Sequence, residues 1–199
     1  RNLSIYSRMA VETGRRLGLD EKSLAAVRIG MNIYDVGMMK VPRHIRGKKE
    51  KLQDSEWDEL KKHPDIGYSL ISPMGLDERI MKMIRSHHEN YRGGGYPEGS
   101  VVSKGCPGPG IIQVVDSFRA LISQGPYKRQ VAPDEAVKEI LALAGKRFEP
   151  RVAEEFAEVF EEFRASGEIE GFDVRSGTEI ASLKKTEKGL EYDEVEEKV

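Results

Sequence analysis

Several residue types are scarce in this sequence, and each shortage excludes a class of protein. Cys106 is the single cysteine among 199 residues, so no internal disulfide can form, and a reducing cytoplasm is the expected setting. No apolar run approaches the ~20 residues that a membrane-spanning helix needs, and no signal peptide is recognisable. The formal net charge is −2, which gives no general attraction to nucleic acid. We therefore expect a cytoplasmic protein that partners neither a membrane nor a nucleic acid.

The composition that remains is typical of a globular domain. Hydrophobic residues make up 38% of the chain and charged residues 33%, which predicts one substantial domain with a highly charged surface and a small appendage. The chain begins with Arg1 rather than methionine. We therefore expect a fragment of a longer protein, with a sensor or receiver domain upstream.

The apolar spacing is helical along most of the chain. Asp20 is a predicted helix cap, and Ser55 with Asp58 has capping-box spacing. Residues 92–110 are rich in glycine and proline and predict a long loop, a kind of segment that often carries function. The pattern predicts an all-α fold, a helical bundle without substantial sheet in residues 1–165, with helices over residues 3–18, 20–34, 55–63, 77–90, 110–123, 133–145 and 152–163.

The pattern changes after Gly167. Residues 168–174 alternate between polar and apolar types as a strand does, and the remainder is polar and acidic. We therefore divide the chain into a helical domain over residues 1–165 and an acidic C-terminal extension over residues 166–199. The extension is expected to form a small hairpin or to be partly disordered.

Three of the four histidines are candidates for a shared metal ion. His87 and His88 are adjacent, and His87 continues the apolar stripe that contains Ile80 and Ile84; His63 lies upstream. Two buried imidazoles need partners for four ring nitrogens, and a metal ion would satisfy one nitrogen of each. The alternative is a pair of ordinary hydrogen-bonded histidines, which is the commoner case for two adjacent histidines alone.

The motifs around these histidines occur in a recognisable order. They read YDVGM at residues 34–38, KHPDIG at 62–67, HHE at 87–89, GGGYP at 93–97, VVDSFRAL at 114–121, GPYK at 125–128 and GKRFEP at 145–150. Over residues 2–163 they resemble the HD-GYP family, bacterial metal-dependent hydrolases that open cyclic di-GMP in signal transduction. The resemblance implies an HD-superfamily multi-helix bundle with a long GYP loop.

The resemblance also implies a metal site. The positions that match family ligands are Asp35, His63, His87, His88 and Asp116. Asp116 is also a candidate on its own, because its place in the helical pattern turns it toward the interior, where a carboxylate needs a cation or several donors. The implied cofactor is a divalent metal, iron or manganese, with Asp35 also in a catalytic position.

Two family ligands are absent from this sequence. The early histidine corresponds to Asn2, and the histidine of the HD pair corresponds to Tyr34. Neutral amide and phenol groups are poor substitutes for imidazole on a divalent metal, although a phenolate can bind ferric iron. Because both losses affect the same ion, we expect one bound ion rather than two, or none.

Other departures change the charge of the site. Met38, counted with the catalytic positions, replaces the family lysine, and Gly125 replaces the arginine that is expected to hold substrate phosphate, whereas Lys128 remains. Arg119 replaces an aspartate, one helical turn after Asp116. Its guanidinium either joins the carboxylate cluster, replacing part of a missing metal charge, or lies exposed on the surface.

Three functions remain in competition. The preferred one is a degenerate HD-GYP module that regulates cyclic di-GMP signalling through binding, with weak or no hydrolysis. The second is an active metal-dependent phosphodiesterase, and the third is a structural output domain without a ligand. Tyr96, Pro97, Lys128 and Arg119 are predicted contacts for a cyclic dinucleotide or for a partner such as a diguanylate cyclase. For the GYP loop, the alternative is a purely structural role.

Overall fold

The fold is an all-α bundle, as the sequence predicts. The computed structural model describes residues 5–101, 106–123, 130–169, 172–173 and 178–179. Within these residues the α-helices are α1 (Ile5–Arg16), α2 (Glu21–Ile33), α3 (Arg43–Arg46), α4 (Asp54–Leu60), α5 (His63–Ile71), α6 (Glu78–Ser86), α7 (Gly108–Ile122), α8 (Pro133–Ala142) and α9 (Pro150–Ala165). Two short 3-10 helices are η1 (Val36–Met39) and η2 (Ser72–Met74).

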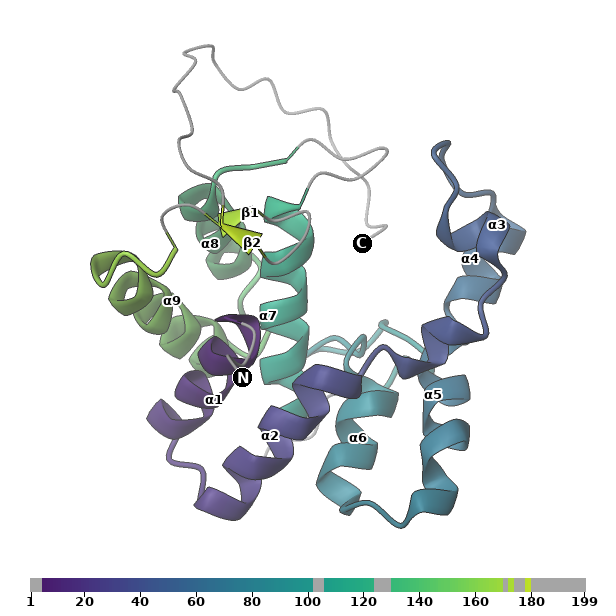
Figure 1. The fold of residues 1–199 in the computed structure, drawn as a ribbon, viewed down its shortest axis with the longest axis horizontal. Coiled ribbons are helices and arrows are strands. Elements are labelled where there is room, and N and C mark those ends of the chain that lie inside the picture. Colours follow the sequence, from purple (N-terminus) through teal and green to yellow (C-terminus); the bar gives the residue numbers. More distant parts are fainter. Residues whose placement is uncertain (1–4, 102–105, 124–129, 170–171, 174–177, 180–199) are drawn as a thin grey trace.

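Helix α7 is the central element of the bundle (Figure 1). It contacts α1, α2, α6, α8 and α9, and twelve of its fifteen residues are buried. The ring of Phe118 packs edge-on against Phe156 and Phe160 of α9, with centroids 5.3 and 5.5 Å apart. Because α7 is apolar nearly all round, packing fixes its position. Its polar residues Asp116 and Arg119 are thereby held at a defined place beside α2.

Of the two helix caps predicted from the sequence, one forms and the other does not. Asp20 caps α2 by accepting a 2.8 Å hydrogen bond from the Ser23 amide, as predicted. The predicted start of α4 at Ser55 is wrong. The helix begins at Asp54, and Glu56 accepts a 2.7 Å hydrogen bond from the Gln53 amide. Gln53 and Glu56 have the same spacing two residues earlier and form the cap. Ser55 therefore lies in the first turn of α4.

Helix α6 is shorter than predicted. It starts after its cap Asp77, but it ends at Ser86, with His87 as its C-cap. His87 and His88 therefore lie at the end of the helix rather than within it. His88 there stacks on Tyr96, and His87 faces His63.

The segment after α9 contains two short strands. β1 (Phe172–Asp173) pairs antiparallel with β2 (Thr178–Glu179), so that Phe172 lies opposite Glu179. These strands fall where a small hairpin was expected, and the boundary at residue 165 stays a prediction. Residues 180–199 lie outside the described part of the chain. No helix among the described residues is long and apolar enough to cross a membrane.

Candidate metal centre

Four of the five predicted metal ligands meet at one place. One ligand atom from each lies within 4.8 Å of the others, and the four residues are Asp35, His63, His87 and His88. Asp35 stands between α2 and η1, His63 begins α5, and the adjacent pair follows α6. Segments distant in sequence thus supply a carboxylate and three imidazoles, a donor set that suits iron, manganese, zinc or nickel.

Two glycines bring Asp35 and His63 together. A Cβ atom on Gly37 would lie 1.9 Å from the His63 carbonyl oxygen and 2.6 Å from the Gly67 nitrogen. The backbone of η1 therefore touches the first turn of α5, which only a residue without a side chain permits at this position. The sequence contains both glycines within the motifs, but motif matching alone does not reveal this contact.

Hydrogen bonds to the backbone orient two of the imidazoles. The Nδ1 atom of His63 lies 2.9 Å from the Leu60 carbonyl oxygen, and that of His87 lies 2.9 Å from the Ile84 carbonyl oxygen. With Nδ1 as the donor in each ring, Nε2 is left as an acceptor. Such backbone contacts are the usual way in which a metal-binding histidine is oriented.

The Nε2 atoms of His63 and His87 face each other in the interior. They are 3.2 Å apart, and Asp35 Oδ1 lies 3.3 Å from the first and 3.7 Å from the second. Both imidazoles are buried, with exposed side-chain fractions of 2% and 0%. Three acceptors this close repel one another unless a proton or a cation lies among them. The residues therefore fit a bound metal ion.

Charge states in the cluster are consistent with this fit. Burial raises the pKa of Asp35, but contacts with His63 and His87, when a proton lies on their Nε2 atoms, outweigh burial and hold that pKa well below its usual range. Burial lowers the pKa of His88 well below its usual value, and the neighbouring histidines add to the effect. An ionised carboxylate thus stands beside a neutral imidazole, and these are the forms that bind metals.

Asp116, the fifth predicted ligand, lies outside this group. Its Oδ1 accepts a 2.5 Å hydrogen bond from the Tyr34 hydroxyl and a 2.9 Å hydrogen bond from Arg119 Nη2. Arg119 Nη2 also lies 3.6 Å from Oδ2 of Asp35. Of the two alternatives for Arg119, the structure shows the one in which the guanidinium joins the carboxylates. A ligand role for Asp116 stays a prediction.

Tyr34 is a donor in this network. Its side chain is buried, and burial together with the negative charges of Asp116 and Asp35 raises the pKa of its hydroxyl above the ordinary value. The hydroxyl therefore acts as a neutral donor to Asp116. The ring of Tyr34 also packs edge-on against His87, with centroids 5.0 Å apart.

The GYP loop covers one side of the cluster. The ring of Tyr96 stacks on His88, with centroids 4.5 Å apart and an interplanar angle of 24°, and its amide donates to the His88 carbonyl oxygen at 3.2 Å. Gly95 permits this approach, since a Cβ there would lie 2.2 Å from the same oxygen. Tyr96 and Pro97, joined by a cis peptide bond, therefore stand beside the candidate metal ligands.

Glu89 anchors the far end of this loop. Its side chain is buried, and Oε1 accepts hydrogen bonds from the amides of Glu98 and Gly99, at 2.6 and 3.1 Å. Gln113 of α7 donates to the Glu89 carbonyl oxygen at 2.8 Å. The third residue of HHE thus has a structural task that the sequence analysis did not assign. Its task is to hold the loop against the bundle.

Arg147 is a second residue that the sequence analysis did not single out. Its carbonyl oxygen accepts from the Tyr91 amide at 2.8 Å, and its Nη2 lies 3.4 Å from the Ser117 hydroxyl. Burial lowers the pKa of its guanidinium, against the charges of Tyr96 and Asp116. The GKRFEP motif therefore brings a half-buried cation to the GYP side of the centre.

The remaining predicted positions contribute less to the described site. Met38 lies half-buried in η1 and brings no charge. Asn2, Gly125 and Lys128 lie outside the described residues, so their predicted roles stay predictions.

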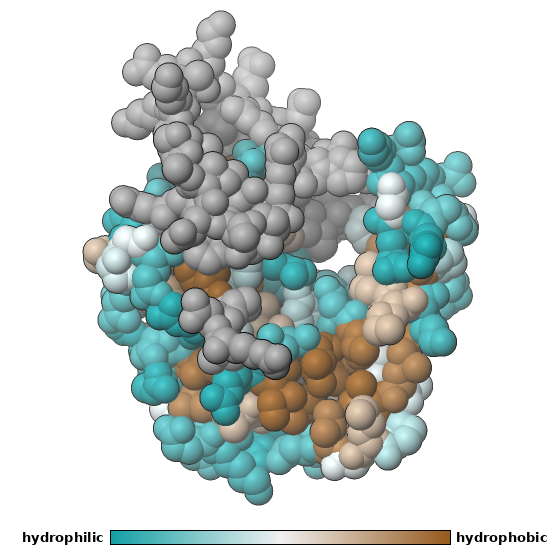
Figure 2. Space-filling model, viewed as in Figure 1, coloured by the Kyte–Doolittle hydropathy of each residue, from teal (hydrophilic) through white to brown (hydrophobic). Residues whose placement is uncertain are grey.

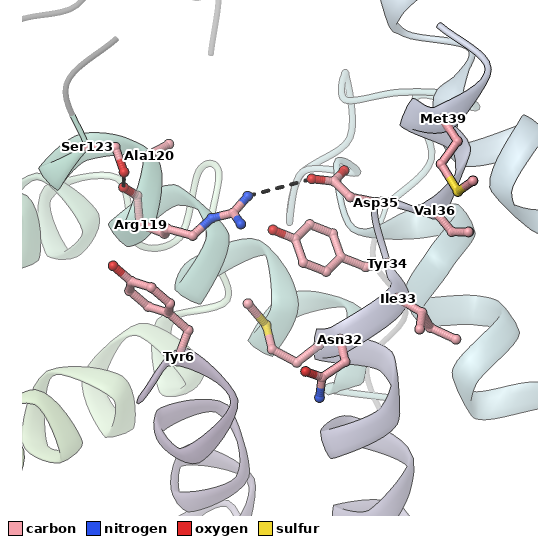
Figure 3. A pocket seen from close by; sticks show the side chains of 11 residues that line it. Tyr6, Asn32, Ile33, Tyr34, Asp35, Val36, Met39, Arg119, Ala120 and Ser123 are labelled. Atoms are coloured by element: carbon pink, nitrogen blue, oxygen red, sulfur yellow. Dashed lines mark hydrogen bonds and ion pairs between the residues drawn. The ribbon is translucent and has the colours of Figure 1, made fainter. Parts of the chain in front are cut away.

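A cavity of about 780 Å³ opens beside the cluster (Figure 3). Asp35, Tyr34 and Arg119 line its polar side, and the remainder of its lining includes Met31, Ile33, Val36 and Met39. Figure 2 shows apolar side chains gathered over the C-terminal part of α2 and toward α5. Ile29 of α2 and Met39 of η1 are among the exposed large hydrophobic residues. The candidate centre thus borders a space large enough for a small molecule, with an apolar wall.

Comparisons with known proteins agree with this arrangement. The HD domain family model matches residues 1–152. A "Cyclic di-GMP phosphodiesterase response regulator RpfG" of Xanthomonas campestris pv. campestris (strain 8004) is 34% identical over 154 residues, which are 75% of this chain and 40% of that protein. A "Cyclic di-GMP phosphodiesterase" of Thermotoga maritima is 31% identical over 149 residues, 73% of this chain and 40% of that protein.

A solved structure supports the fold. Bd1817, an HDG"Y"P protein from Bdellovibrio bacteriovorus, superposes with a TM-score of 0.65 at 18% identity, over 79% of this chain and 51% of that chain. The chain spans 40% of the length of the two curated relatives above. The family match, the helical bundle and the histidine–aspartate cluster together show that the chain belongs to the HD domain family, among relatives named as HD-GYP cyclic di-GMP phosphodiesterases.

Proposed function

We propose that the chain is a degenerate HD-GYP module that binds cyclic di-GMP or a related cyclic dinucleotide and hydrolyses it slowly or not at all. Its role is then regulatory, through ligand binding or contact with a signalling partner in the cytoplasm. The observation that carries the proposal is the pairing of Asp116 with Tyr34 and Arg119. Among the described residues, the four-ligand group then remains for a metal.

Asp35, His63, His87 and His88 are the residues that would hold the ion, and iron or manganese is the proposed metal. Bound there, a divalent ion would supply Lewis-acid polarisation of a phosphodiester. The surrounding residues position this site. Backbone contacts orient His63 and His87, and Tyr96 covers one face of His88.

The proposal of weak hydrolysis follows from the replacement of three side chains that bind metal or carry charge in the family pattern. Tyr34 and Met38 are neutral where the family pattern has a ligand histidine and a lysine, and Gly125 replaces an arginine that grips phosphate. Each loss removes about 2–4 kcal/mol of transition-state stabilisation, so that together they slow turnover by several orders of magnitude. Binding depends instead on the cavity beside the cluster and on the GYP loop.

The GYP loop is the proposed partner contact. Tyr96 and Pro97 are held by Glu89 and Gly95 in a fixed conformation at the border of the site. A diguanylate cyclase domain is the proposed partner. A fixed aromatic residue offers contact area at low entropic cost.

The second candidate function is an active phosphodiesterase, which the retained four-ligand group favours. One experiment separates the two. Protein purified without added metal is analysed for metal content, and cyclic di-GMP binding and hydrolysis are measured on the same sample. We expect about one ion or less per chain, measurable binding and slow or absent turnover. Turnover as fast as that of an intact HD-GYP enzyme, lost on adding a chelator, would replace the regulatory function by the catalytic one.

A further inference from the structure

We propose that Arg119 forms a phosphate-binding subsite beside the metal ligands, in which its guanidinium is a permanent cation of the centre. This inference rests on the proposed function for the identity of the full ligand. It assigns to one residue of this chain the recognition of a phosphodiester.

The first argument is position. Arg119 extends from α7 toward Asp35 and Tyr34 across the cavity in Figure 3. Its Nη2 bonds to Asp116 at 2.9 Å and lies 3.6 Å from Oδ2 of Asp35. The guanidinium carbon also lies 5.7 Å from the centroid of the Tyr34 ring. Two carboxylates and an aromatic face fix the group, so binding an anion there costs little further ordering.

The second argument is donor capacity. A guanidinium has five N–H donors in a planar fork. The ion pairs of Arg119 with described residues engage a single nitrogen, Nη2, and 43% of its side chain is exposed. Hydrogen-bonding capacity therefore remains on a cation that lines a cavity. A phosphate oxygen is the acceptor that this geometry binds best.

The third argument is the rest of the cavity wall. Tyr6 of α1 also lines the cavity, and burial raises the pKa of its hydroxyl, so it is a neutral donor. Met31, Ile33 and Val36 supply apolar surface next to these polar groups. A ligand with one charged phosphate and an adjoining flat apolar group matches this lining. A phosphodiester bearing a nucleobase has both parts.

A purely structural role for Arg119 predicts a different result, so the test compares variants. Arg119→Gln removes the charge and keeps hydrogen-bonding ability, and Arg119→Lys keeps the charge without the fork. Arg164→Gln is the matched control, since Arg164 of α9 is a similarly exposed arginine, 50%, that pairs with Asp134 of α8 and does not line the cavity. Each protein is assayed for thermal stability and, by elemental analysis, for metal content.

Two probes are then titrated into each protein at equal metal content. Inorganic phosphate is followed by phosphorus NMR line width, and fluorescent cyclic di-GMP is followed by anisotropy. We expect Arg119→Gln to weaken the binding of both probes about 10- to 100-fold, with metal content retained, because one charge-assisted contact is lost. Arg119→Lys should restore part of the affinity, and Arg164→Gln should behave as wild type.

Each other outcome is decisive. Equal phosphate affinity in wild type and Arg119→Gln, or no phosphate binding in wild type, overturns the subsite. Loss of metal together with phosphate in Arg119→Gln also overturns it, because Arg119 would then only hold the ligands in place. If wild type binds phosphate through Arg119 but does not bind cyclic di-GMP, the subsite stands and the proposed function fails.

Discussion

Replacement of Gly37 by alanine tests whether the contact between η1 and α5 assembles the metal centre. The added Cβ would lie 1.9 Å from the His63 carbonyl oxygen and 2.6 Å from the Gly67 amide nitrogen. Both obstacles are backbone atoms, so no side-chain rotation can relieve the overlap. The two segments must separate by about 1.5 Å or more to restore an ordinary van der Waals distance. Asp35, two residues before Gly37, then moves away from His63.

The expected magnitude follows from overpacking against backbone. Small-to-large changes in tightly packed sites cost about 1–3 kcal/mol, and a backbone obstacle places Gly37→Ala at the upper end of this range. For a chain of this length, about 2–3 kcal/mol corresponds to a fall in melting temperature of about 4–12 °C. Misplacement of a ligand should also weaken metal binding about 10- to 100-fold, as loss of a supporting contact does.

Gly110→Ala is the matched control for Gly37→Ala. A Cβ on Gly110 would meet only Val152, at 3.8 Å, an ordinary contact inside α7. Alanine is about 0.5–1 kcal/mol better than glycine within a helix, so this variant should be as stable as wild type or slightly more stable. Circular dichroism on heating gives the melting temperatures, and titration with Mn²⁺ gives the affinities. An unchanged melting temperature and affinity for Gly37→Ala would refute the reasoning.

Two further substitutions test the centre and its loop. Replacing His87 and His88 together by alanine should abolish metal binding measured by elemental analysis. The control His44→Ala, at an exposed position outside the cluster, should bind metal as wild type does. Unchanged metal content in the double variant would exclude this site. Glu89→Ala should cost about 1–3 kcal/mol, because it leaves two part-buried loop amides without their acceptor. It should also speed tryptic cleavage after Arg92, and an unchanged digestion rate would show that Glu89 does not hold the loop.

The sequence predicted the helices best where one strong periodic signal is present. Apolar spacing located the ends of α7 and α9 to within two residues, because both bury a broad apolar surface. The start of α4 was missed, since Gln53 with Glu56 and Ser55 with Asp58 have the same spacing. The residue types alone do not determine which of two capping boxes with the same spacing forms. The packing of the whole segment decides which one forms.

The sequence predicted which residues form the candidate site better than it predicted which of them contact one another. Motif spacing indicated Asp35 and the histidines, and the structure brings these four together. The same spacing did not show that Asp116 is held by Tyr34. Nor did it show that Arg147 lies near the site. Both relations join segments far apart in the sequence, and only the packing against α7 determines them.

Asp35 links the two halves of the centre, because its two carboxylate oxygens face different partners. Oδ1 lies 3.3 Å from His63 Nε2, and Oδ2 lies 3.6 Å from Arg119 Nη2. The guanidinium attracts the negative charge of the Asp35 carboxylate, so the carboxylate binds an ion among the histidines less strongly. An anion that engages Arg119 would weaken this pull and strengthen the carboxylate as a ligand. Since coupling between two binding sites is reciprocal, metal at the histidines and phosphate at Arg119 should each favour the other.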